Sequence, residues 1–279
     1  MVRQGSARPR GAPGRRANMA AMGSFNRRQF TGIEVAHIAD GTRGFAPHFH
    51  DEFVISVNVR GWEKIKLDRK CFDAAEGDVT LYNPAQVQSS HVISESWQFA
   101  SMYVDPAALP VLLGIHPETV FDRPLLQAPG IAARLRGAIL SALNRNTPES
   151  VAQEGLVHVF DELLQMAGSG GPATSRHVPA SIGGIADRLR DDPALPTLTD
   201  LAASAGMTPV QLVRAFSRVY GMPPLAWRWN QRVVAARKRI AQGENIAAVA
   251  LDLGFADQSH LTRRFRAVVG VPPGQWRDG

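Results

Sequence analysis

The sequence contains a single cysteine, Cys71, and no long run of apolar residues. One cysteine forms no disulfide within the chain and no cysteine-rich metal site, which excludes a small secreted scaffold held together by disulfides. The longest apolar stretch, residues 107–115, is interrupted by proline and glycine and is too short to cross a bilayer. The basic N-terminus is not followed by the apolar segment of a secretory signal. We therefore expect a cytoplasmic protein without a membrane partner.

Acidic residues are absent from residues 1–28, which contain seven arginines. This segment is rich in Gly, Ala and Pro and cannot bury a core, so it is predicted to be a disordered basic tail. It could also be an upstream extension of a chain that truly starts at Met19 or Met22, which is the interpretation we favour.

The remaining charge is also unevenly distributed. Residues 29–179 contain 11 basic and 17 acidic residues, whereas residues 180–279 contain 13 basic and 8 acidic residues. A basic C-terminal region suits a polyanion such as nucleic acid, although a solvated basic surface would have the same composition.

Short β-rich segments punctuated by Gly, Asn, Pro and Asp dominate the region before residue 105. They predict an antiparallel sandwich or barrel over residues 29–125. Helical spacing then predicts a helical hairpin within residues 126–170, with an apolar face that we expect to mediate dimerisation. A flexible linker is expected at residues 171–180, followed by an all-helical domain at 181–279. The fold class is α+β. The predicted strands are residues 33–38, 53–60, 62–67, 78–82 and 97–104. The apolar face of the hairpin consists of Leu135, Ile139, Leu143, Leu156, Phe160 and Leu163.

A thirteen-residue pattern occurs twice in the helical domain. LVRAFSRVYGMPP starts at Leu212, and LTRRFRAVVGVPP starts at Leu261. In each copy a Leu and a Phe fall on one helix face, an Arg falls on the opposite face, and Gly-x-Pro-Pro ends the helix. A shorter helix precedes each copy across a glycine turn, which predicts two helix-turn-helix units. The N-caps are expected at Thr197, Thr208, Asn245 and Asp257.

The two units are separated by a segment predicted to form one long helix, residues 224–243. A single recognition helix reads only a few base pairs in one major groove. Two such helices on one rigid connector can read successive grooves, about 34 Å apart. A helical bundle with a chance repeat is the alternative, and the matching caps and polarity in both copies argue against it.

The segment IAAVALDLGFADQSHLTRRFRAVVGVPPGQWR, residues 246–277, closely resembles the signature of AraC/XylS-family transcription regulators. The resemblance covers roughly residues 180–279 and implies sequence-specific binding to double-stranded promoter DNA. A homodimer is expected from the apolar face of the hairpin, and RNA polymerase is a further candidate partner. Base readout is expected from Arg214 and Arg263, and phosphate contacts from Arg218 and Arg266. The remaining residues carried over from the family's recognition helices are Val210, Gln211, Gln258, Ser259 and Thr262.

Residues 45–105 resemble, less closely, the cupin-like effector domain of the same family. The landmarks are Arg60-Gly61, Gly77-Asp78, Pro84 and His91. The resemblance implies a pocket for a small-molecule effector, in which Arg would supply bidentate hydrogen bonds and Trp a stacking face. The expected pocket residues are His48, His50, Arg60, Tyr82, His91 and Trp97.

Two other functions remain open from the sequence. His48, His50 and His91 could hold a metal ion in a cupin enzyme, although Val54 and Ile55 stand where the metal-binding pattern places a Glu. The barrel could also serve only for dimerisation of a constitutive DNA-binding protein. We expect a non-enzymatic regulator with no cofactor, whose effector, promoter and sign of regulation the sequence does not specify.

Overall fold

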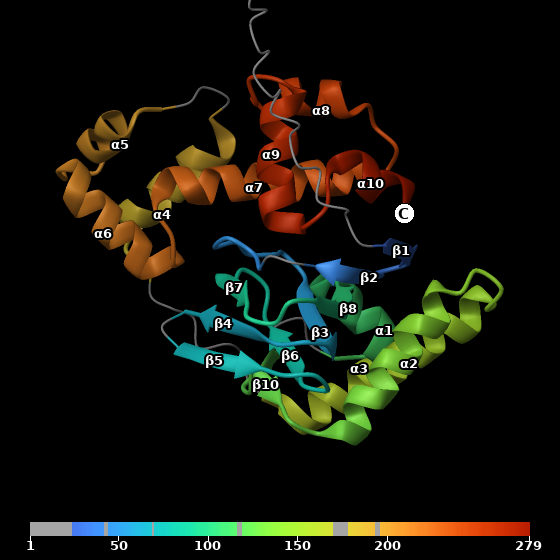
Figure 1. Ribbon diagram of the computed structural model, residues 1–279. Helices are drawn as coiled ribbons and strands as arrows, with labels where there is room; N and C mark the ends of the chain where they lie inside the picture. The colour runs from blue at the N-terminus through green and yellow to red at the C-terminus, as the bar shows by residue number, and fades with distance from the viewer. Residues whose placement is uncertain (1–23, 42–43, 69, 116–118, 170–177, 193–195) are drawn as a thin grey trace, which may run out of the picture.

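The computed structural model describes residues 24–41, 44–68, 70–115, 119–169, 178–192 and 196–279. A strand-rich domain, a helical hairpin and a helical C-terminal domain follow one another along the chain (Figure 1). This arrangement confirms the α+β class. Most of the predicted tail and linker lie outside the described residues, but strand β1 begins at Phe25. Residues 25–28 therefore belong to the sheet, and assigning them to the tail was wrong.

Two antiparallel sheets form the barrel. The five predicted strands correspond to β2, β3, β4, β6 and β8, whereas β1, β5 and β7 were not predicted. The larger sheet has the order β1 (Phe25–Phe30), β2 (Ile33–Gly41), β8 (Trp97–Val104), β3 (Phe53–Arg60), β6 (Val79–Tyr82) and β10 (Leu125–Leu126). The smaller has the order β5 (Lys70–Ala74), β4 (Glu63–Leu67) and β7 (Gln88–Val92). Short elements complete the domain: η1 (Pro106–Ala108), α1 (Leu109–Leu113), and the paired strands β9 (Val120–Phe121) and β11 (Gly168–Ser169).

The helical hairpin consists of α2 (Pro129–Leu143) and α3 (Glu149–Ala167) and covers the outer face of the larger sheet (Figure 1). Its apolar face packs against sheet residues such as Phe53, Ile55 and Met102 in one core. The expected dimer face is thus covered within the protomer, because strands alternate their side chains and the outer face of this sheet is itself apolar. The six residues are therefore core residues rather than a free interface: five are buried, and Leu143 is half-buried.

The C-terminal domain contains both predicted helix-turn-helix units, α5–α6 and α8–α9, joined by α7. All four expected N-caps are observed. For example, the Thr208 hydroxyl accepts a hydrogen bond from the backbone N–H of Gln211, 3.3 Å away. The helices are α4 (Ala180–Asp191), α5 (Leu198–Ser204), α6 (Pro209–Tyr220), α7 (Pro224–Ala241), α8 (Ile246–Asp252), α9 (Gln258–Val269) and α10 (Pro273–Asp278).

Each helix-turn-helix unit rests on the barrel. Phe49 enters the core of the first unit, and Phe25 enters the core of the second. The recognition helices α6 and α9 end at Gly221 and Gly270, whose φ values of 76° and 87° require glycine. A Cβ atom on Gly221 would lie 2.9 Å from Val87, and one on Gly270 would lie 2.9 Å from Phe45. The repeated glycines therefore also mark the points where both helices meet the barrel.

The position of the hairpin leads to a stability prediction within α3. Leu163→Ala removes a fully buried side chain from the shared core and should cost about 2–5 kcal/mol of unfolding free energy. Met166→Ala, one turn away and 38% exposed, should change it by less than about 0.5 kcal/mol. Urea unfolding of both variants measures the difference. Equal effects would contradict packing of this face on the sheet.

Candidate functional site

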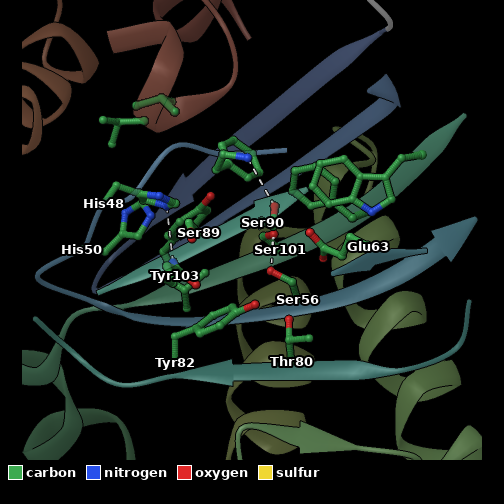
Figure 2. Close-up of a pocket in the computed structure, with 17 residues that line it drawn as sticks. His48, His50, Ser56, Glu63, Thr80, Tyr82, Ser89, Ser90, Ser101 and Tyr103 are labelled. Atoms are coloured by element: carbon green, nitrogen blue, oxygen red, sulfur yellow. Dashed lines mark hydrogen bonds between the residues drawn. The ribbon is translucent and has the colours of Figure 1, made fainter. Parts of the chain in front are cut away.

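A small pocket, part of it open to solvent, lies between the two sheets (Figure 2). Strands β3, β4, β6, β7 and β8 and the segment before β3 supply most of its lining. Two further lining residues, Val268 and Val269, come from the end of α9. The second recognition helix therefore forms part of the pocket wall.

Aromatic rings form one wall of the pocket. Trp97 and Phe99 stack with ring centroids 4.3 Å apart, and Phe45 meets both edge-on at 5.7 and 5.9 Å. The indole N–H of Trp97 donates to the side-chain carbonyl of Asn58 at 3.2 Å, which satisfies its only polar atom. The wall thus offers ring faces to a ligand while its own hydrogen-bonding group is occupied.

Hydroxyl groups face the aromatic wall. Ser56 and Ser101 hydrogen-bond to each other at 2.6 Å across β3 and β8. Thr80 and Tyr82 come from the neighbouring strand β6. Burial raises the pKa of the Tyr82 phenol, and the nearby Glu63 raises it further, so Tyr82 is a neutral hydrogen-bonding group.

A buried carboxylate, Glu63, reaches the pocket from the first residue of β4. The strand alternates, with Glu63, Ile65 and Leu67 facing inward and two lysines facing solvent. Burial raises the pKa of Glu63 to about 7, and a hydrogen bond from the Ser90 hydroxyl partly opposes that shift. Sequence reasoning missed this residue, although its place in the alternation of EKIKL was the signal that could have found it.

His48 and His50 lie at the opposite end of the pocket, with ring centroids 5.0 Å apart. The His48 Nδ1–H donates to the Ala46 carbonyl at 2.8 Å, which leaves Nε2 to accept from the Gln88 amide at 3.4 Å. Burial lowers the pKa of His48 to about 4. The pKa of His50 is lowered by burial, by His48 and by Arg237, whose Nη1 donates to His50 Nδ1 at 3.2 Å. Both rings are therefore neutral near pH 7.

The structure places four of the six expected effector residues in the pocket: His48, His50, Tyr82 and Trp97. Arg60 and His91 are exposed and do not line it, so their assignment to the pocket was wrong. Strand alternation would place Arg60 on the same face of β3 as Val54 and Ser56, which line the pocket. A one-residue register shift between β3 and β8 turns Arg60 outward instead. His91 lies on the outer face of β7, opposite Lys64.

The same geometry argues against the proposed three-histidine metal site. His91 does not converge with His48 and His50, and His50 already accepts a hydrogen bond from a cationic guanidinium. Glu52, a possible substitute ligand, pairs with Arg237 at 2.7 Å. Across the described ranges, no group of three or more His, Cys, Asp or Glu side chains is arranged to hold a metal ion.

A buried ion cluster connects the barrel to α7. Arg237 pairs with Glu52 at 2.7 Å and lies 4.0 Å from Glu34, which in turn pairs with Arg27 at 3.2 Å. The Arg237 guanidinium also lies over the Tyr103 ring, 4.8 Å from its centroid. These partners are up to about 200 positions apart in sequence, so no local pattern indicated them.

The expected DNA-contacting residues fall on the exposed faces of α6 and α9. Arg214, Arg218, Arg263 and Arg266 are exposed and form no ion pair with another described residue. The side-chain oxygen of Gln211 accepts from the Thr208 backbone N–H at 2.9 Å, so only its amide nitrogen remains free. The Thr262 hydroxyl donates to the Gln258 carbonyl at 2.8 Å. The other expected positions, Val210, Gln258 and Ser259, are exposed.

Comparison with known proteins assigns both halves of the chain. The family model of an AraC-like ligand binding domain matches residues 31–159, and that of a helix-turn-helix domain matches residues 201–279. The chain belongs to the AraC family of transcription regulators. It is accordingly a DNA-binding regulator with a ligand-binding N-terminal domain.

Two transcription regulators match the chain along most of their length. The chain is 26% identical to YbfI, an HTH-type transcriptional regulator of Bacillus subtilis, over 78% of this chain and 81% of that protein. It is 25% identical to the arabinose operon regulatory protein of Salmonella typhimurium, over 81% and 84%. Structures of ToxT from Vibrio cholerae share the fold. One with an unsaturated fatty acid bound has a TM-score of 0.55 at 15% identity, covering 90% of this chain and 96% of ToxT.

No helix in the described part of this AraC-family chain is long and apolar enough to cross a membrane.

The raised pKa of Glu63 leads to a prediction about stability and pH. The folded protein keeps this proton up to about pH 7, whereas the unfolded chain loses it near pH 4.5, so stability is lost as the pH rises between these values. Glu63→Gln should therefore stabilise the protein by about 3 kcal/mol at pH 8 and by less than about 1 kcal/mol at pH 5. Urea unfolding at both pH values measures this.

Glu76→Gln, the same change at an exposed position, is the control and should have little effect at either pH. His48 titrates in the opposite sense, because its lowered pKa removes stability as the pH falls from 6.5 to about 4. That contribution is common to the native chain and the variant and cancels in the difference. A stabilisation independent of pH would contradict a buried, titrating carboxyl group.

Proposed function

We propose that α6 and α9 read two successive major grooves of promoter DNA. The observation that carries this proposal is the pair of recognition helices, with exposed and unpaired arginines, attached to the two ends of one 18-residue helix, α7. Arg214 and Arg263 each lie two residues after a buried leucine, so they point away from the core toward a base edge. Arg218 and Arg266 lie nearer the helix ends, where the phosphate backbone passes.

The other contacts proposed for DNA are weaker or more local. Val210, 59% exposed at the start of α6, suits apolar contact with a thymine methyl group. In α9, the polar side chains at the start of the helix share the readout with Arg263. The full set proposed is Val210, Gln211, Arg214, Arg218, Gln258, Ser259, Thr262, Arg263 and Arg266.

We propose that the pocket between the sheets is the effector site and that its ligand acts directly on α9. Val268 and Val269 line the pocket, and they are on the same helix as Arg263 and Arg266. A ligand that packs against these valines binds with different affinity to conformations of the protein in which α9 lies in different positions. This difference in affinity shifts the equilibrium between those conformations. His48, His50, Tyr82 and Trp97 are the sequence-derived residues retained in this site.

We propose that the pocket binds its ligand without transforming it. Both histidines are neutral and already hydrogen-bonded, and the third histidine of the metal-enzyme alternative lies outside the pocket. A cytoplasmic location and contact with RNA polymerase fit a regulator of this family. We also propose a homodimer, whose interface uses exposed residues at the hairpin turn, Leu140 (45% exposed) and Val151 (56% exposed), in place of the buried face.

The arginine assignments predict two kinds of DNA-binding defect. Arg263→Ala should weaken a selected binding site by about 1–3 kcal/mol and leave random DNA almost unchanged. Arg266→Ala should weaken both DNAs alike and reduce the salt dependence of binding by about one charge. Titrations of the full chain on both DNAs across salt concentrations measure this. Arg136→Ala, which removes the same charge from an exposed position on α2, is the control. Equal losses on both DNAs for Arg263→Ala would make that residue a phosphate contact.

The dimer interface is tested by sedimentation of the double variant Leu140→Asp, Val151→Asp. Two charges on this surface should convert a dimer to a monomer with an unchanged circular dichroism spectrum, because like charges would be buried against their copies. Val111→Asp, at an 87% exposed position outside the hairpin, should remain dimeric. A double variant that stays dimeric would place the interface elsewhere.

A further inference from the structure

The charge of the pocket lining restricts what it can bind. Among the described residues that line it, Glu63 is the only one that ionises near neutral pH, and none is Lys or Arg. Glu63 is 5% exposed, and it forms no ion pair with another described residue. Arg237 lies behind His50 and is already paired with Glu52. The pocket therefore presents one buried carboxyl group without a counter-charge (Figure 2).

A buried carboxylate without a cation is unfavourable, and a bound cation removes that cost. The wall formed by Phe45, Trp97 and Phe99 adds a second feature of cation sites. Ring faces carry negative potential, and clusters of aromatic rings recognise ammonium groups. Carboxylate and rings line the same cavity, so a single small ligand can contact both.

We propose that the pocket binds a small organic cation, whose ammonium group pairs with the Glu63 carboxylate and packs against the aromatic wall of Phe45, Trp97 and Phe99. The hydroxyls of Ser56, Thr80 and Ser101 hydrogen-bond to an uncharged polar group on the same ligand. This inference rests on the proposed function of the pocket as the effector site, and it adds the chemical class of the effector.

The protonation equilibria favour a cation over an anion. Because the pKa of Glu63 is about 7, ionising it at pH 7 lowers the affinity for a cation only about twofold. An anion would need a positive partner, and protonating His48, with a pKa of about 4, would cost about a thousandfold at the same pH. A carboxylate such as the fatty acid bound to ToxT would also meet Glu63. The charge of the lining therefore selects against that class of ligand here.

Isosteric probes separate charge from shape. Choline and 3,3-dimethyl-1-butanol share one shape but are cationic and neutral, and 3,3-dimethylbutyrate is an anion of similar size. 2-Phenylethylamine, 2-phenylethanol and 3-phenylpropionate form a second such set. Calorimetric titration of each probe into the full chain at pH 7.5 should show that at least one cation binds about 10–100-fold more tightly than its neutral and anionic counterparts, the range expected for a charge-assisted contact with Glu63. 2-Phenylethylamine can make this contact through an N–H, whereas choline, which has no N–H on its nitrogen, makes it as an ion pair.

Glu63→Gln keeps the size of the side chain and should reduce this preference to about 2–5-fold, the part that the aromatic rings alone supply. Glu76→Gln, outside the pocket, should preserve the ratio. Equal or tighter binding of the neutral or anionic probes, no binding of any cation at millimolar concentrations, or an undiminished preference in Glu63→Gln would each overturn the proposal. The thermal unfolding of Glu63→Gln shows that a reduced preference is not a lost fold.

A second measurement distinguishes the ligand class from the function of the pocket. The DNA affinity of the full chain is measured with and without each probe that binds. Preferential binding of a cation without any change in DNA affinity would support the ligand class and contradict the effector role. A neutral or anionic probe that binds in the pocket and alters DNA affinity would support the effector role and contradict the ligand class.

Discussion

The buried guanidinium of Arg237 constrains where the DNA-binding domain lies on the barrel. It is 5% exposed and belongs to α7, the helix that carries both helix-turn-helix units, whereas its partners Glu34 and Glu52 belong to the barrel. Removing one member of such a cluster leaves a buried charge unpaired, at a cost of about 3–5 kcal/mol. Desolvation offsets much of the attraction within a complete cluster, so we infer that it determines relative position more than it adds stability.

The coupling that we propose between the two functions depends on one helix. The exposed face of α9 carries Arg263, and its far end lines the proposed effector pocket with Val268 and Val269 before Gly270 meets Phe45. Phe45 is itself part of the aromatic wall. A ligand stacked on this wall would therefore touch the residue that the C-terminal end of α9 contacts. A displacement at one end of a helix is transmitted along its length, because the backbone hydrogen bonds keep the helix rigid. We therefore infer that a small movement of α9 at the pocket would reach the residues proposed to read DNA without an intervening chain of contacts.

The predictability of each feature follows from how far apart its determinants lie. The caps at Thr208 and Asp257 depend on backbone groups at most three residues away, and the sequence predicted them correctly. The likeness of the C-terminal segment to AraC-family regulators also identified the function. Arg60 was misplaced because a register shift in β3 depends on its pairing with β8, which the local pattern does not encode. The Arg237 cluster joins residues nearly two hundred positions apart, so only the folded chain reveals it.

The helical hairpin has a structural reason to be buried. The interior of the barrel combines apolar side chains with serines, a carboxyl group and a pocket, and polar groups and cavities reduce the stability gained from burial there. The larger sheet carries a second apolar face on its outer side, where Phe53, Ile55 and Val57 alternate with Val54 and Ser56 in the pocket. Helices α2 and α3 cover that outer face and provide the apolar core. The hairpin therefore supplies apolar burial that the pocket side of the barrel does not, and the dimer interface that we propose uses the side of the hairpin that faces away from the sheet.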